Sequence, residues 1–97
     1  MTKIYIAGPI TGMEEKAAEK FAEAEIFLKA KGYEVINPMK LAHDHDKTWK
    51  AYMLECLHVL LQCDEVYMLN GWRKSKGAKL EHRIASDFDL QIHYKGN

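Results

Sequence analysis

Short β-like runs alternate regularly with helical segments along this chain, and this alternation is the feature that most constrains its fold. The β-like runs are residues 4–7, 33–36, 64–69 and 90–94, and the helical patterns are residues 14–31, 49–62 and 77–87. Gly8-Pro9, Asn37-Pro38 and Asn70-Gly71 close the first three runs with residues that favour turns. Such alternation predicts a parallel sheet with helices on both faces. We therefore expect an α/β fold, a small doubly wound, flavodoxin-like sheet of four parallel strands in the order 2-1-3-4.

The first two helical segments carry apolar side chains at helical spacing, which identifies the faces that we expect to be buried. In the first segment these residues are Ala17, Phe21, Ala24 and Leu28. In the second segment they are Trp49, Tyr52, Met53, Cys56, Leu57 and Leu60. Each helix should therefore pack one face against the sheet.

The composition is that of one ordinary globular domain, which we take to be residues 1–97. Of the 97 residues, 47% are hydrophobic and 29% are charged, and the 14 basic and 14 acidic residues cancel. This balance disfavours nonspecific binding to nucleic acid or to an anionic membrane. No run approaches the roughly 20 apolar residues of a membrane span, and the N-terminal segment does not resemble a signal peptide.

Cys56 and Cys63 are seven residues apart, on one predicted helix and its exit. Two turns of helix separate them, which is too far for a disulfide bond. We interpret both as buried thiols, and we expect the protein to work in a reducing cytoplasm.

The order 2-1-3-4 predicts a ligand crevice at the carboxyl ends of strands one and three, where the strand order reverses. Residues 8–12 follow the first strand and residues 70–77 follow the third. Glu81 lies in the helix that comes next. These three segments should converge on the crevice.

Glu81 is the strongest candidate for a functional side chain. Ala78, Ile84, Ala85 and Phe88 stand at −3, +3, +4 and +7 from it, so Glu81 falls on the apolar stripe of its helix. A buried carboxylate costs free energy unless it is paired or used, and the nearby helix N-terminus favours its charged form. Such a group suits a nucleophile or a general base. The alternative is a first-turn glutamate that only complements the helix dipole.

The turn after the first strand contains Gly8, Pro9, Thr11 and Gly12. Its small residues let backbone N–H groups approach a phosphate or a sugar, although it matches neither the P-loop nor the dinucleotide-binding pattern. A strand-to-helix turn also needs such residues for its own geometry. Tyr5 precedes this turn in a buried strand, where it either fills the core or hydrogen-bonds to Glu81.

The loop at residues 70–77 carries a tryptophan, three cations and a serine. Trp72 could stack on a base or another planar ligand. Ser75 could donate to a sugar or phosphate oxygen at the mouth of the following helix. The alternative is a solvated basic turn in which Trp72 folds back onto the core.

The run His43-Asp44-His45-Asp46 invites a metal-binding interpretation, which we disfavour. Alternating side chains of one short loop rarely surround an ion, and the sequence offers no evident further ligands. Asp46 or Thr48 is better explained as the cap of the helix that starts at Trp49. We therefore expect no metal and no organic cofactor.

Taken together, several of these segments resemble the DUF4406 proteins, small chains common in phage and bacterial genomes. The segments that carry the resemblance are residues 4–12, 37–38, 63–69, 71–72 and 75–81. That family is similar to the nucleoside 2-deoxyribosyltransferase-like group, which includes the 2′-deoxynucleoside 5′-phosphate N-hydrolases. The resemblance covers nearly the whole chain.

In those enzymes a glutamate at the position of Glu81 attacks the anomeric carbon, as in retaining glycosidases. The resemblance implies that Tyr5 orients this glutamate and that Ser75 contacts substrate. The substrate-binding residues expected on this basis are Gly8, Pro9, Thr11, Gly12, Asn37, Trp72, Ser75 and Gly77. Many relatives complete each site with a second subunit, so a homodimer or larger homo-oligomer is also implied.

Two departures from the relatives bear on activity. The N-hydrolases carry an aspartate where this chain has Cys56, and Glu55 beside it points about 100° away around the helix. The arginine of their first loop is also missing. The leading hypothesis is an enzyme that cleaves or exchanges the base of a nucleoside or nucleoside 5′-monophosphate. The alternatives are an inactive nucleotide-binding module and a protein-interaction module; nucleic-acid and membrane partners are not expected.

Overall fold

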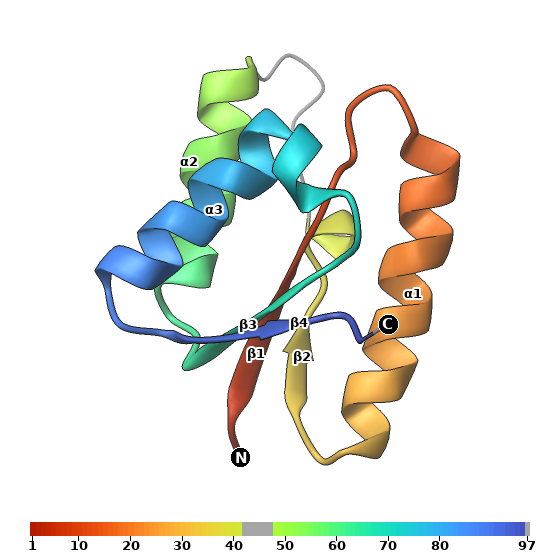
Figure 1. The fold of residues 1–97 in the computed structure, drawn as a ribbon, viewed down its shortest axis with the longest axis vertical. Helices are drawn as coiled ribbons and strands as arrows, with labels where there is room; N and C mark the ends of the chain where they lie inside the picture. The colour runs from red at the N-terminus through yellow and green to blue at the C-terminus, as the bar shows by residue number, and fades with distance from the viewer. Residues whose placement is uncertain (42–47, 97) are drawn as a thin grey trace.

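The computed structural model describes residues 1–41 and 48–96, which form three helices, four strands and two short 3-10 turns (Figure 1). In chain order the elements are β1 Lys3–Ala7, α1 Glu14–Ala30, β2 Glu34–Ile36, η1 Pro38–Lys40, α2 Trp49–Leu60, β3 Glu65–Met68, η2 Trp72–Lys74, α3 Lys76–Asp87 and β4 Gln91–Tyr94. Every predicted helix and strand is present, with ends that differ by no more than two residues.

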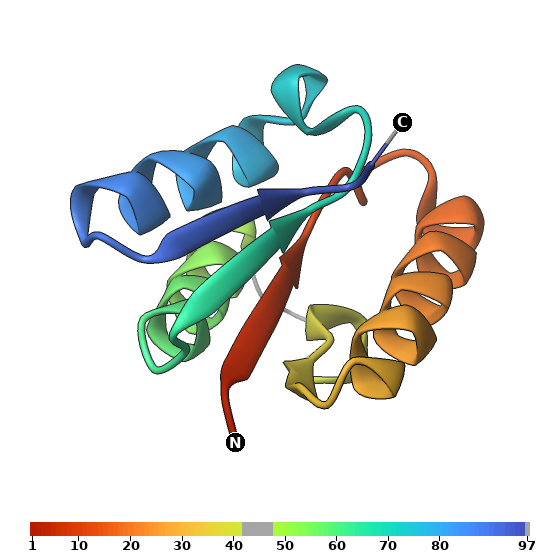
Figure 2. The same cartoon turned by 60° about the horizontal axis from the view of Figure 1, so that its bottom comes forward.

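The four strands form one parallel sheet in the order β2-β1-β3-β4, as predicted (Figure 2). In the register, Tyr5 of β1 pairs with Ile36 of β2 on one side and with Val66 of β3 on the other. The central strand β1 therefore has neighbours on both sides. Its carboxyl end meets that of β3, which is where a ligand crevice was expected.

Side chains of β1 alternate between the two faces of the sheet. Ile4 and Ile6 pack in the core under α1, whereas Tyr5 and Ala7 pack in the core under α2 and α3 (Figure 1). All four are essentially inaccessible to solvent. Burial on both faces explains why this strand is a continuous apolar run rather than an alternating one.

The predicted buried stripes of the helices are largely confirmed. In α1 the four predicted residues are buried. In α2 Met53, Cys56 and Leu60 are buried and Tyr52 and Leu57 are half-buried. Trp49 is 41% exposed at the start of that helix, so its predicted burial is wrong. Phe88 is different: α3 ends at Asp87, and Phe88 at its C-terminus is 60% exposed. Its predicted place on the buried stripe of α3 is therefore wrong, because that position lies beyond the last helical turn.

Two side chains cap the helices that border the crevice. Oγ1 of Thr48 accepts a hydrogen bond from the amide of Ala51 at 3.1 Å, and Oγ of Ser75 accepts one from Ala78 at 3.2 Å. The cap of α2 is thus one of the two residues predicted. The run from His43 to Asp46, considered above for metal binding, lies outside the described residues.

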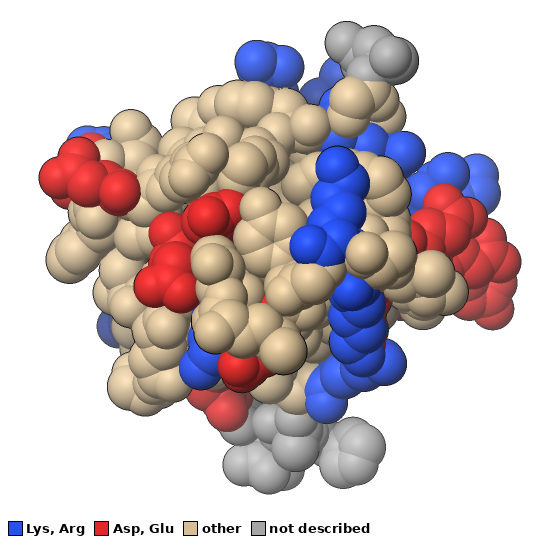
Figure 3. Space-filling view, turned by 90° about the horizontal axis from the view of Figure 1, so that it is seen from below, with Lys and Arg blue, Asp and Glu red and all other residues tan. Residues whose placement is uncertain are grey.

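Basic and acidic side chains are interspersed over the surface. On the face seen in Figure 3 several lysine and arginine side chains form a column right of the centre, and carboxylates lie on both sides of it. Within residues 1–41 and 48–96, no helix is both long and apolar enough to cross a membrane. Cys56 and Cys63 are both buried free thiols, as the sequence predicted.

Candidate active site

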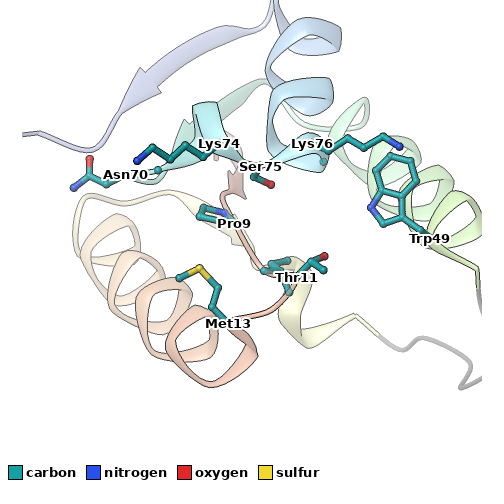
Figure 4. A pocket seen from close by; sticks show the side chains of 11 residues that line it. Pro9, Thr11, Met13, Trp49, Asn70, Lys74, Ser75 and Lys76 are labelled. Atoms are coloured by element: carbon teal, nitrogen blue, oxygen red, sulfur yellow. The ribbon is translucent and has the colours of Figure 1, made fainter.

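A cleft of about 640 Å³ opens at the carboxyl ends of β1 and β3 (Figure 4). One wall is the turn between β1 and α1, and the opposite wall is the segment from Asn70 to the start of α3. Trp49, the first residue of α2, closes one end. The lining residues are Pro9, Ile10, Thr11, Met13, Trp49, Asn70, Gly71, Lys74, Ser75, Lys76 and Gly77. The volume falls within the range of small-molecule sites in proteins.

Two glycines allow the walls of this cleft to form. A Cβ on Gly8 would lie only 2.9 Å from Cβ of Leu69, so a larger residue would push the β1–α1 turn away from the end of β3. Gly71 has a φ of +86°, in the left-handed region that other residues adopt reluctantly, and it starts η2. The walls of the cleft therefore depend on the absence of a side chain at Gly8 and on the left-handed backbone of Gly71.

A narrower chamber of about 30 Å³ lies beneath the cleft. It shares lining residues Ile10, Thr11, Trp49, Ser75 and Gly77 with the cleft. Its other lining residues are Tyr5, Gly8, Phe21, Pro38, Tyr52, Met53, Cys56, Ala78 and Glu81. The cleft thus leads down to Glu81, and the space beside that carboxyl group is about the size of a water molecule.

The hydroxyl of Tyr5 donates a hydrogen bond to Oε2 of Glu81 at 2.5 Å. Both side chains are buried, and Glu81 is only 6% exposed. The parallel pairing of β1 with β3, together with the packing of α3 over them, brings the two residues together from 76 positions apart in sequence. Tyr5 is therefore the residue that orients the carboxyl group of Glu81.

Burial raises the pKa of Glu81 to about 7, and the hydrogen bond from Tyr5 opposes this shift without reversing it. The sequence predicted an ionised carboxylate held by the helix dipole, but loss of solvent outweighs that effect here. Burial, and then the neighbouring Glu81, raise the pKa of the Tyr5 hydroxyl well above 10. Tyr5 therefore stays a hydrogen-bond donor at every physiological pH, while Glu81 exchanges its proton near neutrality.

Cys56 and Tyr52 extend this buried group of polar side chains. Cys56 and Tyr52 line the chamber together with Tyr5 and Glu81, and burial raises the pKa of both Cys56 and Tyr52. Sequence reasoning assigned Tyr52 only to the core of α2. Its spacing of four residues from Cys56 was the available signal, because that spacing places both on one helix face.

The sequence model of DUF4406, described as a domain of unknown function, matches residues 2–94. The chain belongs to the DUF4406 family. Among curated proteins, none matches it. The family match covers β1 through β4 and thus every residue of the cleft and chamber.

Most of the site residues predicted for this DUF4406 domain meet in one place. Tyr5, Gly8 and Glu81 line the chamber, Pro9 lines the cleft, and Thr11, Ser75 and Gly77 line both. Gly12 lines neither space. It has a φ of +83°, and its amide donates to Oε2 of Glu14 at 3.2 Å, which makes it part of the turn that starts α1.

Asn37 also lies away from the cleft and chamber linings. Its side-chain amide donates to Oε1 of Glu25 at 3.0 Å, and its carbonyl oxygen accepts from the amide of Met39. It therefore caps η1 and ties β2 to α1. The structure gives it this packing role and no place in the lining of the cleft.

Trp72 packs against α3 instead of lining the cleft. Its ring stacks on His82, with centroids 4.1 Å apart and an interplanar angle of 18°, and the guanidinium of Arg73 lies 4.7 Å from its centroid. The aromatic side chain that lines both cleft and chamber is Trp49. Sequence reasoning missed it because its position on the apolar stripe of α2 explained it as core.

The cleft of this DUF4406 domain is positively charged. Lys74 and Lys76 line it, and no carboxylate is among its described lining residues. In the part of the chain that the structure describes, no group of three or more histidine, cysteine, aspartate or glutamate side chains is placed to hold a metal ion. The arrangement therefore combines a basic outer cleft with a single oriented carboxyl group beneath it.

Proposed function

We propose that this DUF4406 domain cleaves or exchanges the N-glycosidic bond of a nucleoside or nucleoside 5′-monophosphate. The observation that carries the proposal is the buried hydrogen bond from Tyr5 to Glu81 at the bottom of a ligand-sized cleft. A carboxyl group that is oriented by one donor and becomes ionised as the pH rises through about 7 can act as a nucleophile in its ionised form.

In the proposed reaction, Oε1 of Glu81 attacks the anomeric carbon of the sugar, because Tyr5 occupies Oε2. The carbon–nitrogen bond breaks, its electron pair leaves with the base, and the base takes a proton from solvent, which the attacking water returns in the second step. The resulting glycosyl ester is then attacked by water, which regenerates the carboxylate and releases the sugar. Attack by the nitrogen of a second base would instead exchange one base for another. This is the two-step course of a retaining glycosidase.

The other lining residues suit the non-reacting parts of such a substrate. Thr11 and Ser75 present hydroxyl groups where cleft and chamber meet, next to Gly77. Gly8, also in the chamber, lets the backbone approach closely. We assign these residues to the sugar, and Lys74 and Lys76 to a phosphate where the substrate has one. No cofactor is needed for this chemistry.

A binding module without turnover is the second candidate. One observation favours it: the chamber beside Glu81 holds only about 30 Å³. The resemblance to the N-hydrolases adds a second reason, because it places Cys56 where those enzymes carry an aspartate. Burial raises the pKa of Cys56, so its thiol is a poor substitute for that acid. In this case a nucleotide would fill the outer cleft and remain intact.

Release of the free base is the test of the enzyme. The protein is incubated with ribonucleosides, deoxyribonucleosides and their 5′-monophosphates, and the products are separated by chromatography. We expect base release that falls at least 1000-fold in Glu81→Gln and is retained in Glu19→Gln, which removes an exposed carboxylate on α1. Base release that survives Glu81→Gln would refute the proposal, and binding without base release would establish the module.

Two accompanying predictions concern the setting of the protein. We propose that it acts in the cytoplasm and as a homo-oligomer, with neither nucleic acid nor membrane as partner. Light scattering after size exclusion should give a mass of at least two chains. A monomer that is fully active would remove the need for a second subunit at the site.

A further inference from the structure

Trp49 and Lys76 form a contact at one end of the cleft. The ammonium of Lys76 lies 4.3 Å from the centroid of the Trp49 ring, and both side chains line the cleft (Figure 4). Trp49 is 41% exposed. A ring that lines a ligand-sized cleft and remains accessible is a ready surface for a planar ligand, but here a cation covers it.

The second tryptophan is already engaged elsewhere. Trp72 stacks on His82 and lies near Arg73, and it lines neither the cleft nor the chamber. Trp49, in contrast, borders both the outer cleft and the chamber that contains Glu81. A base held on this ring would therefore lie next to the chamber that contains Glu81.

The contact of the Lys76 ammonium with the Trp49 ring can be replaced by a contact with an anion. Among residues 1–41 and 48–96, no carboxylate forms an ion pair with Lys74 or Lys76. The ammonium of Lys76 therefore has a ring as its partner where an anion would be a stronger one. An anionic group entering the cleft would attract both lysines.

We propose that Trp49 is the residue on which the base of the ligand stacks, and that Lys76 covers it until an anionic group of the ligand draws the ammonium away. Binding of the anion and exposure of the ring are then one event. The cleft consequently selects a nucleoside 5′-monophosphate over the same nucleoside. The choice of a nucleotide as ligand rests on the proposed function; the exchange itself rests on the Trp49–Lys76 contact.

Tryptophan fluorescence tests this proposal without turnover. In a Glu81→Gln background, Trp72→Phe leaves Trp49 as the single reporter, and Trp49→Phe leaves Trp72. Each is titrated at constant ionic strength with dAMP, dGMP, dCMP and dTMP, and with the four corresponding nucleosides. We expect saturable quenching only where Trp49 remains, at monophosphate concentrations at least tenfold lower than those of the nucleosides.

Replacement of the covering cation tests the exchange. Lys76→Gln should reduce the advantage of monophosphate over nucleoside to threefold or less, with nucleoside binding unchanged or tighter. Lys79→Gln removes an exposed cation one turn further along α3 and should leave the advantage intact. Quenching in the variant that retains only Trp72 would overturn the proposal. So would a Lys76→Gln variant that prefers monophosphates over nucleosides as strongly as the parent does. Calorimetry that detects no binding of any of the eight compounds would also overturn it.

Failure of this inference can be told apart from failure of the proposed function. Quenching of Trp49 by monophosphates without any base release would leave the inference standing and refute the enzyme. Base release with a KM that is unchanged in both Trp49→Leu and Lys76→Gln would leave the enzyme standing and refute the inference. Circular dichroism and thermal melting of each variant show whether it is folded.

Discussion

The hydroxyl of Tyr5 on the central strand lies 2.5 Å from Oε2 of Glu81 on α3, and this hydrogen bond fixes the only oriented carboxyl group among the described residues that line the chamber. The hydrogen bond also favours the ionised form of Glu81. It thereby opposes the effect of burial, and the pKa that results from both is about 7. One hydroxyl group therefore orients the carboxyl group of Glu81 and partly offsets the effect of burial on its pKa.

Tyr5→Phe should weaken catalysis and move its pH dependence. We expect kcat/KM for base release to fall about 10- to 100-fold, because a charged hydrogen bond is lost. The rising limb of the pH profile should move above about 7, since the interaction that lowers the pKa of Glu81 is gone. Tyr33→Phe is the control. The hydroxyl of Tyr33 donates a hydrogen bond of 2.9 Å to Oε1 of Glu65, and neither residue lines the cleft. A profile that keeps its midpoint in Tyr5→Phe would contradict the assignment.

Glu81→Gln should stabilise the fold increasingly as the pH rises. Folded Glu81 keeps its proton up to about pH 7, whereas the unfolded chain releases it near 4.5. The stabilisation that Glu81 gives to the folded state is therefore fully present below pH 4.5 and is lost as the pH rises through 7. Relative to the parent protein, the free energy of unfolding of Glu81→Gln should increase by roughly 2 kcal/mol between pH 5 and pH 8. Urea denaturation at both pH values measures this, and a constant difference would be inconsistent with a raised pKa.

Gly8→Ala should destabilise the protein by about 1–3 kcal/mol. The added methyl group would lie 2.9 Å from Cβ of Leu69, an atom close to the backbone that cannot turn aside. The thermal midpoint measures the loss. Gly96→Ala places the same group in open space and should change stability by less than about 0.5 kcal/mol. Equal midpoints for the two variants would mean that the turn adapts to the clash.

Glu25 should stabilise the fold at neutral pH and lose this effect in acid. Its carboxylate meets Lys29 at 2.6 Å, Lys40 at 3.1 Å and Asn37 at 3.0 Å, and the Lys29 contact contributes most to lowering its pKa to about 2. Its contribution is present above the unfolded value near 4.5 and lost as the pH falls towards 2. Glu25→Gln should cost roughly 2 kcal/mol at pH 7 and much less at pH 2.5. Denaturation at both pH values tests this; the exposed Glu23→Gln should show no such dependence.

The sheet and its helices were predictable from local patterns. Apolar runs closed by turn residues identified the strands, and apolar spacing such as that of Ala17 and Phe21 identified the buried helix faces. These signals report which side of an element avoids water, and that property is encoded within a few residues. The rules that govern parallel connections leave few strand orders, and the flavodoxin-like order chosen among them is the one observed. The predicted burial of Phe88 was wrong because the spacing of apolar residues does not show where the last helical turn ends.

The site was only partly predictable. Glu81 and Tyr5 were identified, the former because a carboxylate on an apolar stripe conflicts with its surroundings and the latter because it lies on a strand next to the crevice. The roles of Trp49 and Trp72 were not predictable, because the sequence does not show which of the two aromatic rings faces the crevice. Only the packing of Trp72 on His82 and the place of Trp49 at the cleft separate them.

The sequence by itself determined the elements, their order in the sheet and the edge at which a ligand would bind, because these depend on periodicity and connection rules. The tertiary structure decided which side chains face the cleft and which cap a turn, as Asn37 does. It also decided the proton affinity of Glu81. The orientation of a side chain and its loss of solvent depend on all the residues around it. Strand register and helix packing bring these residues together from distant parts of the chain, so no single segment contains them.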